Sequence, residues 1–205
     1  MAKNTKETKA KELYELLESI SKYIERKINM YSLGGTALTI LGIKPSTLDI
    51  DIDIESQKDY KYICEIFERI GFKKIGSIRW QAQEGLFFDL FRGSNILGTD
   101  LLRDYTNKSK FIKSFGNIEL YTLSLYDIII TKLARGDPRD FIDIKMIFVT
   151  QEISLTNLVK RYKETMESSI GANYKQKLLD LIEIEFTHWK FKLDKKLIHE
   201  VKRWQ

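Results

Sequence analysis

The chain has 205 residues, of which 43% are hydrophobic and 31% charged, and its formal net charge is +5 at pH 7. This balance is typical of a folded globular protein and excludes a mainly disordered one. The single cysteine, Cys64, excludes an intrachain disulfide, and His188 and His199 are too few for a histidine-rich metal site. The sequence has no apolar run of about 20 residues, the length of a membrane span, and its polar start has no apolar signal core. We therefore expect a cytoplasmic protein with no membrane partner.

The first part of the chain predicts helices and strands in alternation. Apolar residues at three- and four-residue steps predict the helices, which cover about 7–27, 36–41 and 58–70. Alternating or β-branched runs predict the strands, which cover 30–33, 48–54, 72–78, 86–91, 111–115 and 118–121. Gly71 is placed to end the third helix, and a tight turn joins the last two strands.

From residue 123 onward the hydrophobic period is helical. The expected helices cover 124–134, 138–149, a segment capped by Ser154, 173–188 and 194–204. Strands followed by a run of helices favour an α+β fold. We expect a mixed sheet with flanking helices over residues 1–122, and a helical C-terminal region over residues 123–205 that packs on this core.

The strand over 48–54 alternates aspartate with apolar residues, so one of its faces is acidic. Asp49 and Asp51 project from that face, where two like charges repel each other. A divalent cation such as Mg²⁺ or Mn²⁺ relieves this repulsion, and magnesium is commonly held by one or two carboxylates together with substrate phosphates. The alternative to a metal site is an ordinary strand whose outer face is exposed to solvent.

Two glycines, Gly34 and Gly35, stand at a strand-to-helix junction and are followed by Thr36. Glycines there let the backbone approach a ligand closely, and the N–H groups at a helix start favour phosphate. The alternative is a tight turn without a ligand. A phosphate cradle followed by a two-carboxylate metal site is, however, what chemistry on a magnesium–nucleoside triphosphate requires.

Leu33-Gly34-Gly35, a spacer of thirteen residues and Asp49-Ile50-Asp51-Ile52 resemble the signature of the nucleotidyltransferase superfamily, which has the polymerase-beta-like fold. The segments Gly34 to Leu38 and Ser46 to Asp51 resemble, more narrowly, the group that contains the nucleotidyltransferase-type toxins of abortive-infection systems. Many members of that group carry an arginine near the position of Ser46-Thr47. This chain has Lys44-Pro45 instead, so its charge contact with a substrate is expected to differ.

The resemblance implies a third carboxylate on a later strand, and the match is Asp89 within Phe87-Phe88-Asp89-Leu90-Phe91. In that role Asp89 would bind metal and accept the proton of an attacking hydroxyl. An isolated carboxylate among large apolar residues is costly unless it is paired or metal-bound. The alternative is an aspartate at a strand edge that faces solvent.

Part of the helical half of this chain resembles a further conserved block of the same group. The matching residues are Lys132 and Arg139-Asp140, with Asp143 three residues after Asp140. The resemblance implies that Lys132 contacts the triphosphate and that Asp140 lines the nucleotide pocket. The alternative is a solvated or ion-paired helix face.

The sequence thus predicts a magnesium-dependent transfer of a nucleoside monophosphate from a nucleoside triphosphate to a hydroxyl of RNA or tRNA, a protein or a small molecule. A toxin–antitoxin role, with a cognate antitoxin as partner, follows from the resemblance alone. One alternative is an inactive nucleotidyltransferase-fold protein that binds or regulates. Another is an RNA-binding module that uses the basic and aromatic residues between Lys160 and Arg203, although these residues also fit a helical core with a solvated face.

Overall fold

The computed structural model describes residues 7–82, 85–169 and 173–204, and the chain divides into two compact units. The first unit comprises Met1–Ile96 and Arg103–Ser124, and the second comprises Leu97–Leu102 and Leu125–Gln205. The sequence predicts a single division between residues 122 and 123. It does not predict that the short segment Leu97–Leu102 belongs to the second unit. The first six residues, on which the expectation of a polar start depends, lie outside the described residues. No helix in the described ranges is long and apolar enough to cross a membrane.

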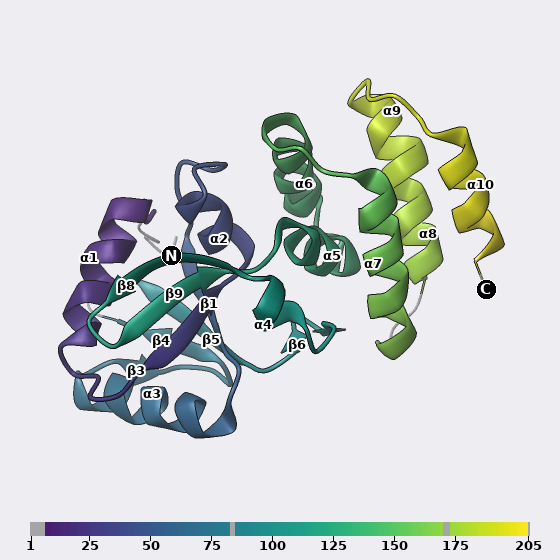
Figure 1. Cartoon of the computed structure of the whole chain (residues 1–205). Helices are drawn as coiled ribbons and strands as arrows, with labels where there is room; N and C mark the ends of the chain where they lie inside the picture. The colour runs from purple at the N-terminus through teal and green to yellow at the C-terminus, as the bar shows by residue number, and fades with distance from the viewer. Residues whose placement is uncertain (1–6, 83–84, 170–172, 205) are drawn as a thin grey trace. The chain divides into compact units, whose positions relative to one another are not determined.

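Within the described part of the first unit, seven strands form one mixed sheet (Figure 1). These strands are β1 (Ile28–Ser32), β2 (Asp49–Ile54), β3 (Lys73–Lys74), β4 (Arg79–Gln81), β5 (Phe87–Arg92), β8 (Lys110–Phe115) and β9 (Ile118–Thr122). Their order across the sheet is β3-β4-β5-β2-β1-β9-β8. The central strand β2 runs parallel to β5 and antiparallel to β1, so it has a hydrogen-bonded neighbour on each side. Two short strands, β6 (Asn95–Ile96) and β7 (Thr99–Asp100), follow β5 along the chain.

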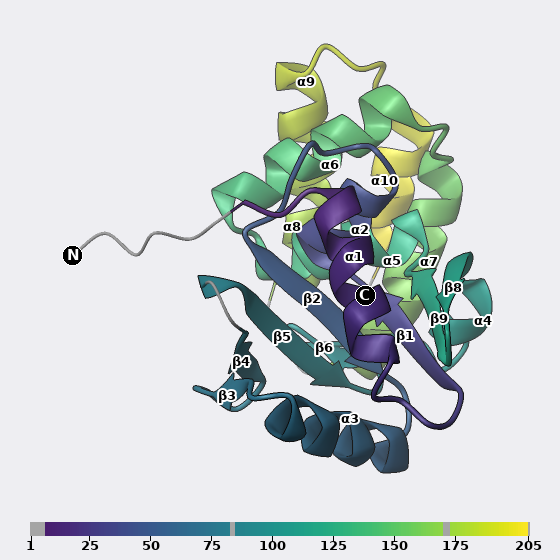
Figure 2. The same ribbon diagram turned by 90° about the vertical axis from the view of Figure 1, so that its left-hand side faces the viewer.

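The alternation along β2 separates two faces of the sheet. Ile50, Ile52 and Ile54 are buried in the apolar core, whereas the aspartates between them point to the opposite face. Helices α1 (Ala10–Ser21) and α3 (Gln57–Arg69) cover the apolar face, where their side chains join the same core (Figure 2). The acidic strand predicted from the sequence therefore also contributes one apolar face to the hydrophobic core.

Local signals in the sequence set the ends of the helices in the first unit. The Ser56 hydroxyl caps α3 by accepting a hydrogen bond from the Asp59 N–H at 3.0 Å, and Gly71 follows the helix with a φ of +86°. The helix expected over 36–41 is α2 (Gly34–Ile40), and a short helix, α4 (Tyr105–Lys108), was not predicted. Gly116, with a φ of +52°, makes the tight turn between β8 and β9.

The strand expected over 72–78 is wrong in most of its length. Only Lys73–Lys74 is a strand, because Ile75 and Gly76 both donate backbone hydrogen bonds to the Arg79 carbonyl and reverse the chain there. The reversal produces a hairpin whose second strand, β4, pairs antiparallel to β5. Arg79 is thereby placed beside the strand that carries Asp89.

The described part of the second unit is mainly helical, as the sequence predicts. Its helices are α5 (Leu125–Arg135), α6 (Pro138–Thr150), α7 (Leu155–Ser168), α8 (Tyr174–Leu179), α9 (Phe186–His188) and α10 (Lys195–Arg203). A π-helical stretch, Asp180–Glu185, joins α8 to α9, so the helix expected over 173–188 is continuous but not regular. The Ser154 hydroxyl caps α7 by accepting from the Asn157 N–H. The predicted fold class, a mixed sheet with flanking helices and a helical C-terminal half, is confirmed.

Candidate functional site

Asp49, Asp51 and Asp89 lie on the same face of two neighbouring strands. Asp51 on β2 is the register partner of Asp89 on β5, and Asp49 precedes Asp51 by two residues. All three are partly exposed, whereas the isoleucines that alternate with them on β2 are buried. The structure therefore gathers the three aspartates that the sequence singled out, and we call them the acidic cluster.

A guanidinium group lies within the acidic cluster. Arg79 is the register partner of Asp89 across the β4–β5 ladder. Its Nε donates to Asp89 Oδ1 at 2.7 Å and its Nη2 to Asp89 Oδ2 at 2.8 Å, while Nη2 also lies 3.0 Å from Asp49 Oδ2. The hydrogen bonds to Asp89 raise the pKa of Arg79, so the group stays charged. Arg79 thus joins two of the three carboxylates.

The remaining aspartate of β2, Asp53, has a different environment. It is fully buried, and the Tyr105 hydroxyl donates a hydrogen bond to its Oδ2 at 2.7 Å. Burial raises the pKa of Asp53 to about 7. Asp53 therefore belongs to the interior of the first unit and not to the acidic cluster.

The two glycines make close approaches that a side chain would prevent. Gly34 has a φ of +56°, and a Cβ atom there would lie 2.8 Å from Asp51 Oδ2. A Cβ atom on Gly35 would lie 2.8 Å from Thr47 Oγ1 and 4.0 Å from the Lys44 ammonium. The backbone at the two glycines therefore packs closely against Asp51 and Thr47, with the Lys44 ammonium nearby.

Thr36 is committed to the backbone of β2. Its hydroxyl donates to the Asp49 carbonyl at 3.1 Å and accepts from the Asp51 N–H at 2.8 Å. A hydroxyl has one proton to donate, so a hydrogen bond from Thr36 to a phosphate would require the bond to Asp49 to break. The side chain fixes α2 against the strand that carries the two aspartates.

The second unit holds Lys132 and Asp140 in a buried ion-pair network. Lys132 is only 2% exposed, and its ammonium contacts Asp140 Oδ1 at 3.1 Å and Asp143 Oδ2 at 2.6 Å. Burial acts to raise the pKa of Asp140, but Arg135 and Lys132 together lower it. These contacts join α5 to α6. The nucleotide contact that the resemblance implies for Lys132 and Asp140 stays a prediction.

The chemistry of the acidic cluster fits a hard divalent cation, because it offers carboxylate oxygens and already attracts a positive group. Within the described ranges, no three His, Cys, Asp or Glu side chains are arranged as a ready metal site. Two of the carboxylates are instead joined through Arg79. The donor types fit Mg²⁺ or Mn²⁺, and the Arg79 guanidinium lies against two of these carboxylates in the structure.

A model of the family described as "Nucleotidyltransferase of unknown function (DUF6036)" matches residues 9–194. The chain belongs to this family. Among solved structures it is similar to a "putative nucleotidyltransferase" from Thermotoga maritima, with 18% identity over 63% of this chain and 88% of that one, and a TM-score of 0.44. None of the curated proteins matches the chain. The resemblance to the nucleotidyltransferase superfamily is thereby confirmed.

Sequence reasoning missed Arg79 in this member of the nucleotidyltransferase family. A usable signal was present, because Ile78-Arg79-Trp80-Gln81-Ala82 alternates apolar and polar residues with the period of a strand. The pattern places Arg79 and the buried Trp80 on opposite faces. It does not show which strand lies beside them.

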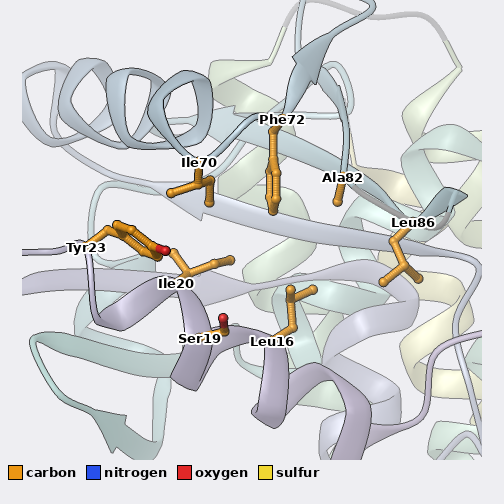
Figure 3. Close-up of a pocket in the computed structure, with 8 residues that line it drawn as sticks. All are labelled: Leu16, Ser19, Ile20, Tyr23, Ile70, Phe72, Ala82 and Leu86. Atoms are coloured by element: carbon orange, nitrogen blue, oxygen red, sulfur yellow. The ribbon is translucent and has the colours of Figure 1, made fainter.

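A separate cavity of about 360 Å³ lies on the other, apolar side of the sheet (Figure 3). Ile20 of α1 and Tyr23, which follows the helix, face Ile70 and Phe72 across it. Among the described residues that line it, none is charged, and Ser19 and Tyr23 supply the polar side-chain atoms. The cavity therefore offers no group for phosphate chemistry, and the acidic cluster is the candidate site for the reaction of this family.

Proposed function

We propose that the protein transfers a nucleoside monophosphate from a nucleoside triphosphate to a hydroxyl acceptor in a reaction that depends on Mg²⁺ or Mn²⁺. The observation that carries the proposal is the placement of Asp49, Asp51 and Asp89 on one face of β2 and β5. Membership of a family described as nucleotidyltransferases supports the reaction class. The acceptor class, RNA or tRNA, a protein or a small molecule, and a toxin–antitoxin role are left as predictions.

In the proposed reaction the acceptor oxygen attacks the α-phosphorus and forms a new P–O bond. The bond from that phosphorus to the bridging oxygen breaks, and pyrophosphate leaves with its electron pair. Asp89 takes the proton of the hydroxyl. Asp49, Asp51 and Asp89 would hold a divalent cation, which would supply stabilisation of the charge on the leaving pyrophosphate.

The nucleotide's phosphates would lie against the Gly34–Gly35 backbone. Neither glycine carries a Cβ atom, so the backbone itself can contact a ligand there, although Asp51 and Thr47 already fill the places where the Cβ atoms would lie. Lys44 is placed beside Gly35 and supplies a positive charge for a phosphate oxygen. This lysine takes the part that the sequence comparison gives to an arginine in related proteins.

The reaction is tested with nucleoside triphosphates labelled in the α- or the γ-phosphate. Each is incubated with Mg²⁺ or Mn²⁺, total RNA and a cell extract, and labelled products are separated. We expect label from the α-phosphate, and none from the γ-phosphate, in RNA, protein or a small molecule. Asp51→Asn and Asp89→Asn should each reduce labelling by about 100-fold or more, since they remove a metal ligand or the proton acceptor.

Asp59→Asn is the matched control, because Asp59 is a half-buried aspartate of the same unit that pairs with Arg26 outside the acidic cluster. It should label as wild type does. Transfer of γ-label would indicate a kinase, and equal α-labelling by wild type and Asp51→Asn would contradict the site.

The second candidate is a binding protein of this fold without transfer activity. The observation that favours it is the Arg79 guanidinium between Asp49 and Asp89, where a positive group already balances the carboxylates. If no α-label is transferred with any nucleotide, metal or extract, while nucleotide still binds, this candidate replaces the first.

A further inference from the structure

The contacts of Arg79 use the oxygens that a metal ion would need. Its two-pronged contact takes both carboxylate oxygens of Asp89, and Nη2 also reaches Asp49 Oδ2. A bidentate arginine–carboxylate contact is among the stronger pairings of protein side chains. A divalent cation and the guanidinium therefore compete for the same two carboxylates.

The exposure of the group allows it to leave. The Arg79 side chain is 37% exposed and that of Asp49 is 34% exposed, whereas Asp89 is 16% exposed. The core side chains of the sheet lie on the other face, so the guanidinium can swing away without opening the core. The guanidinium also lies against the Phe87 ring, whose centroid is 5.5 Å from the guanidinium carbon.

A released guanidinium needs another anion, and a triphosphate is one. The planar fork of arginine matches phosphate as well as carboxylate. A nucleotide bound next to the acidic cluster would thus stabilise Arg79 in the position that leaves Asp89 and Asp49 free to bind metal. Nucleotide and metal would then each favour the binding of the other.

We propose that Arg79 is the resident counter-ion of the acidic cluster, which must leave Asp49 and Asp89 before a divalent cation binds and which then pairs with the phosphates of the nucleotide. The inference rests on the proposed function, because it assumes the metal site. It assigns Arg79 a positioning role and makes metal binding weak until nucleotide is present.

The test measures Mn²⁺ binding by the loss of the free-ion electron paramagnetic resonance signal, with and without α,β-methylene-ATP, which cannot be cleaved at the reacting bond. The loss that this nucleotide causes without protein is measured separately and subtracted. Arg79→Gln should bind Mn²⁺ alone at least tenfold more tightly than wild type, or about 1.4 kcal/mol. The nucleotide should strengthen Mn²⁺ binding less in this variant than in wild type, because no guanidinium remains to be moved.

Arg26→Gln is the matched control. Arg26 is similarly exposed, at 38%, and pairs with Asp59 in the same unit, away from the acidic cluster. Its removal should leave Mn²⁺ binding unchanged. Equal Mn²⁺ affinities for wild type and Arg79→Gln would overturn the inference and leave the proposed function standing. No Mn²⁺ binding by either protein, with or without nucleotide, would overturn both.

A measurement on the wild-type protein covers the case in which Arg79→Gln does not fold. The Arg79 Nε–H, hydrogen-bonded to Asp89, should give a nitrogen–proton NMR signal, assigned by its loss in Arg79→Lys. Adding Mg²⁺ with α,β-methylene-ATP should shift that signal, whereas the signal of Arg26 should not move. An Arg79 signal that stays in place while Mg²⁺ and nucleotide bind would refute the displacement.

Discussion

Gly34 has a left-handed backbone directly against a carboxylate of the acidic cluster. Its φ is +56°, and an added Cβ would lie 2.8 Å from Asp51 Oδ2. We expect Gly34→Ala to lose about 1–3 kcal/mol for the backbone alone and to push the Asp51 carboxylate aside. Urea unfolding measures the stability, and Mn²⁺ binding in the presence of nucleotide measures the displacement.

Gly42→Ala separates these two effects. Gly42 has a φ of +71°, but nothing lies within 4 Å of its Cβ position, so alanine there adds backbone strain without a new contact. We expect Gly42→Ala to be destabilised and to bind Mn²⁺ as wild type does. If both variants lose the same stability and keep the same Mn²⁺ affinity, Gly34 has only a conformational role.

At the scale of elements, Thr36 links α2 to β2. Replacing its hydroxyl by a methyl group in Thr36→Val keeps the shape and removes both hydrogen bonds to the backbone at Asp49 and Asp51. We expect a loss of about 1–3 kcal/mol of stability, since a buried N–H loses its partner. Nucleotide affinity per folded molecule should stay within a factor of two or so. A large drop in affinity at unchanged stability would instead support the nucleotide contact predicted from the sequence.

Lys132 links α5 to α6 as Thr36 links α2 to β2, and its substitution tests that link. Lys132→Met leaves Asp140 and Asp143 without their shared cation in a buried setting, which should cost about 3–5 kcal/mol. The exposed Lys145 on α6 supplies the control, since Lys145→Met should change stability by no more than about 0.5 kcal/mol. Chemical denaturation without nucleotide decides the point. A Lys132→Met protein that is as stable as wild type but binds nucleotide more weakly would instead support the predicted contact between Lys132 and the triphosphate.

The elements that the sequence predicted well are those with a strict period. The alternation of 48–54 predicted the position of β2 and the face of its aspartates, and the cap residue Ser154 marked the start of α7. The expected strand over 72–78 failed because its apolar pattern runs through a reversal at Gly76. A period shows where a regular element can form, but the local backbone hydrogen bonds of a turn, here from Ile75 and Gly76 to Arg79, decide where it stops.

The contacts of the candidate site were harder to predict than its residues. Asp49, Asp51 and Asp89 follow from a motif, but Arg79 reaches them only because β4 pairs with β5. The resemblance implies a phosphate contact for Lys132, but it does not show the ion pairs of Lys132 with Asp140 and Asp143 on the next helix, eight and eleven residues away. The sequence names such charges without showing which of them neutralise each other.

At the scale of the whole molecule, the candidate residues fall into two units. The acidic cluster, both glycines, Lys44 and Arg79 belong to the first unit, whereas Lys132 and Asp140 belong to the second. A ligand stabilises the folded form that binds it, by an amount that grows with the logarithm of its concentration relative to its dissociation constant. The unit that nucleotide and metal stabilise therefore reveals which group of residues binds them.

Trp80 makes this measurement possible. It is buried in the first unit and packs against Phe67, while Trp189 and Trp204, the other tryptophans of the sequence, belong to the second unit. In a Trp189→Phe/Trp204→Phe variant, Trp80 is the tryptophan that remains. Fluorescence excited at about 295 nm, where tryptophan absorbs, then reports the first unit alone. The free energy of unfolding that Trp80 reports in urea should rise by about 2.7 kcal/mol when the complex of Mg²⁺ with α,β-methylene-ATP is present at a hundred times its dissociation constant. Asp49→Asn in the same background should abolish this gain. If nucleotide binds and yet the Trp80 transition does not move, the first unit does not hold the nucleotide, and the acidic cluster loses its assignment.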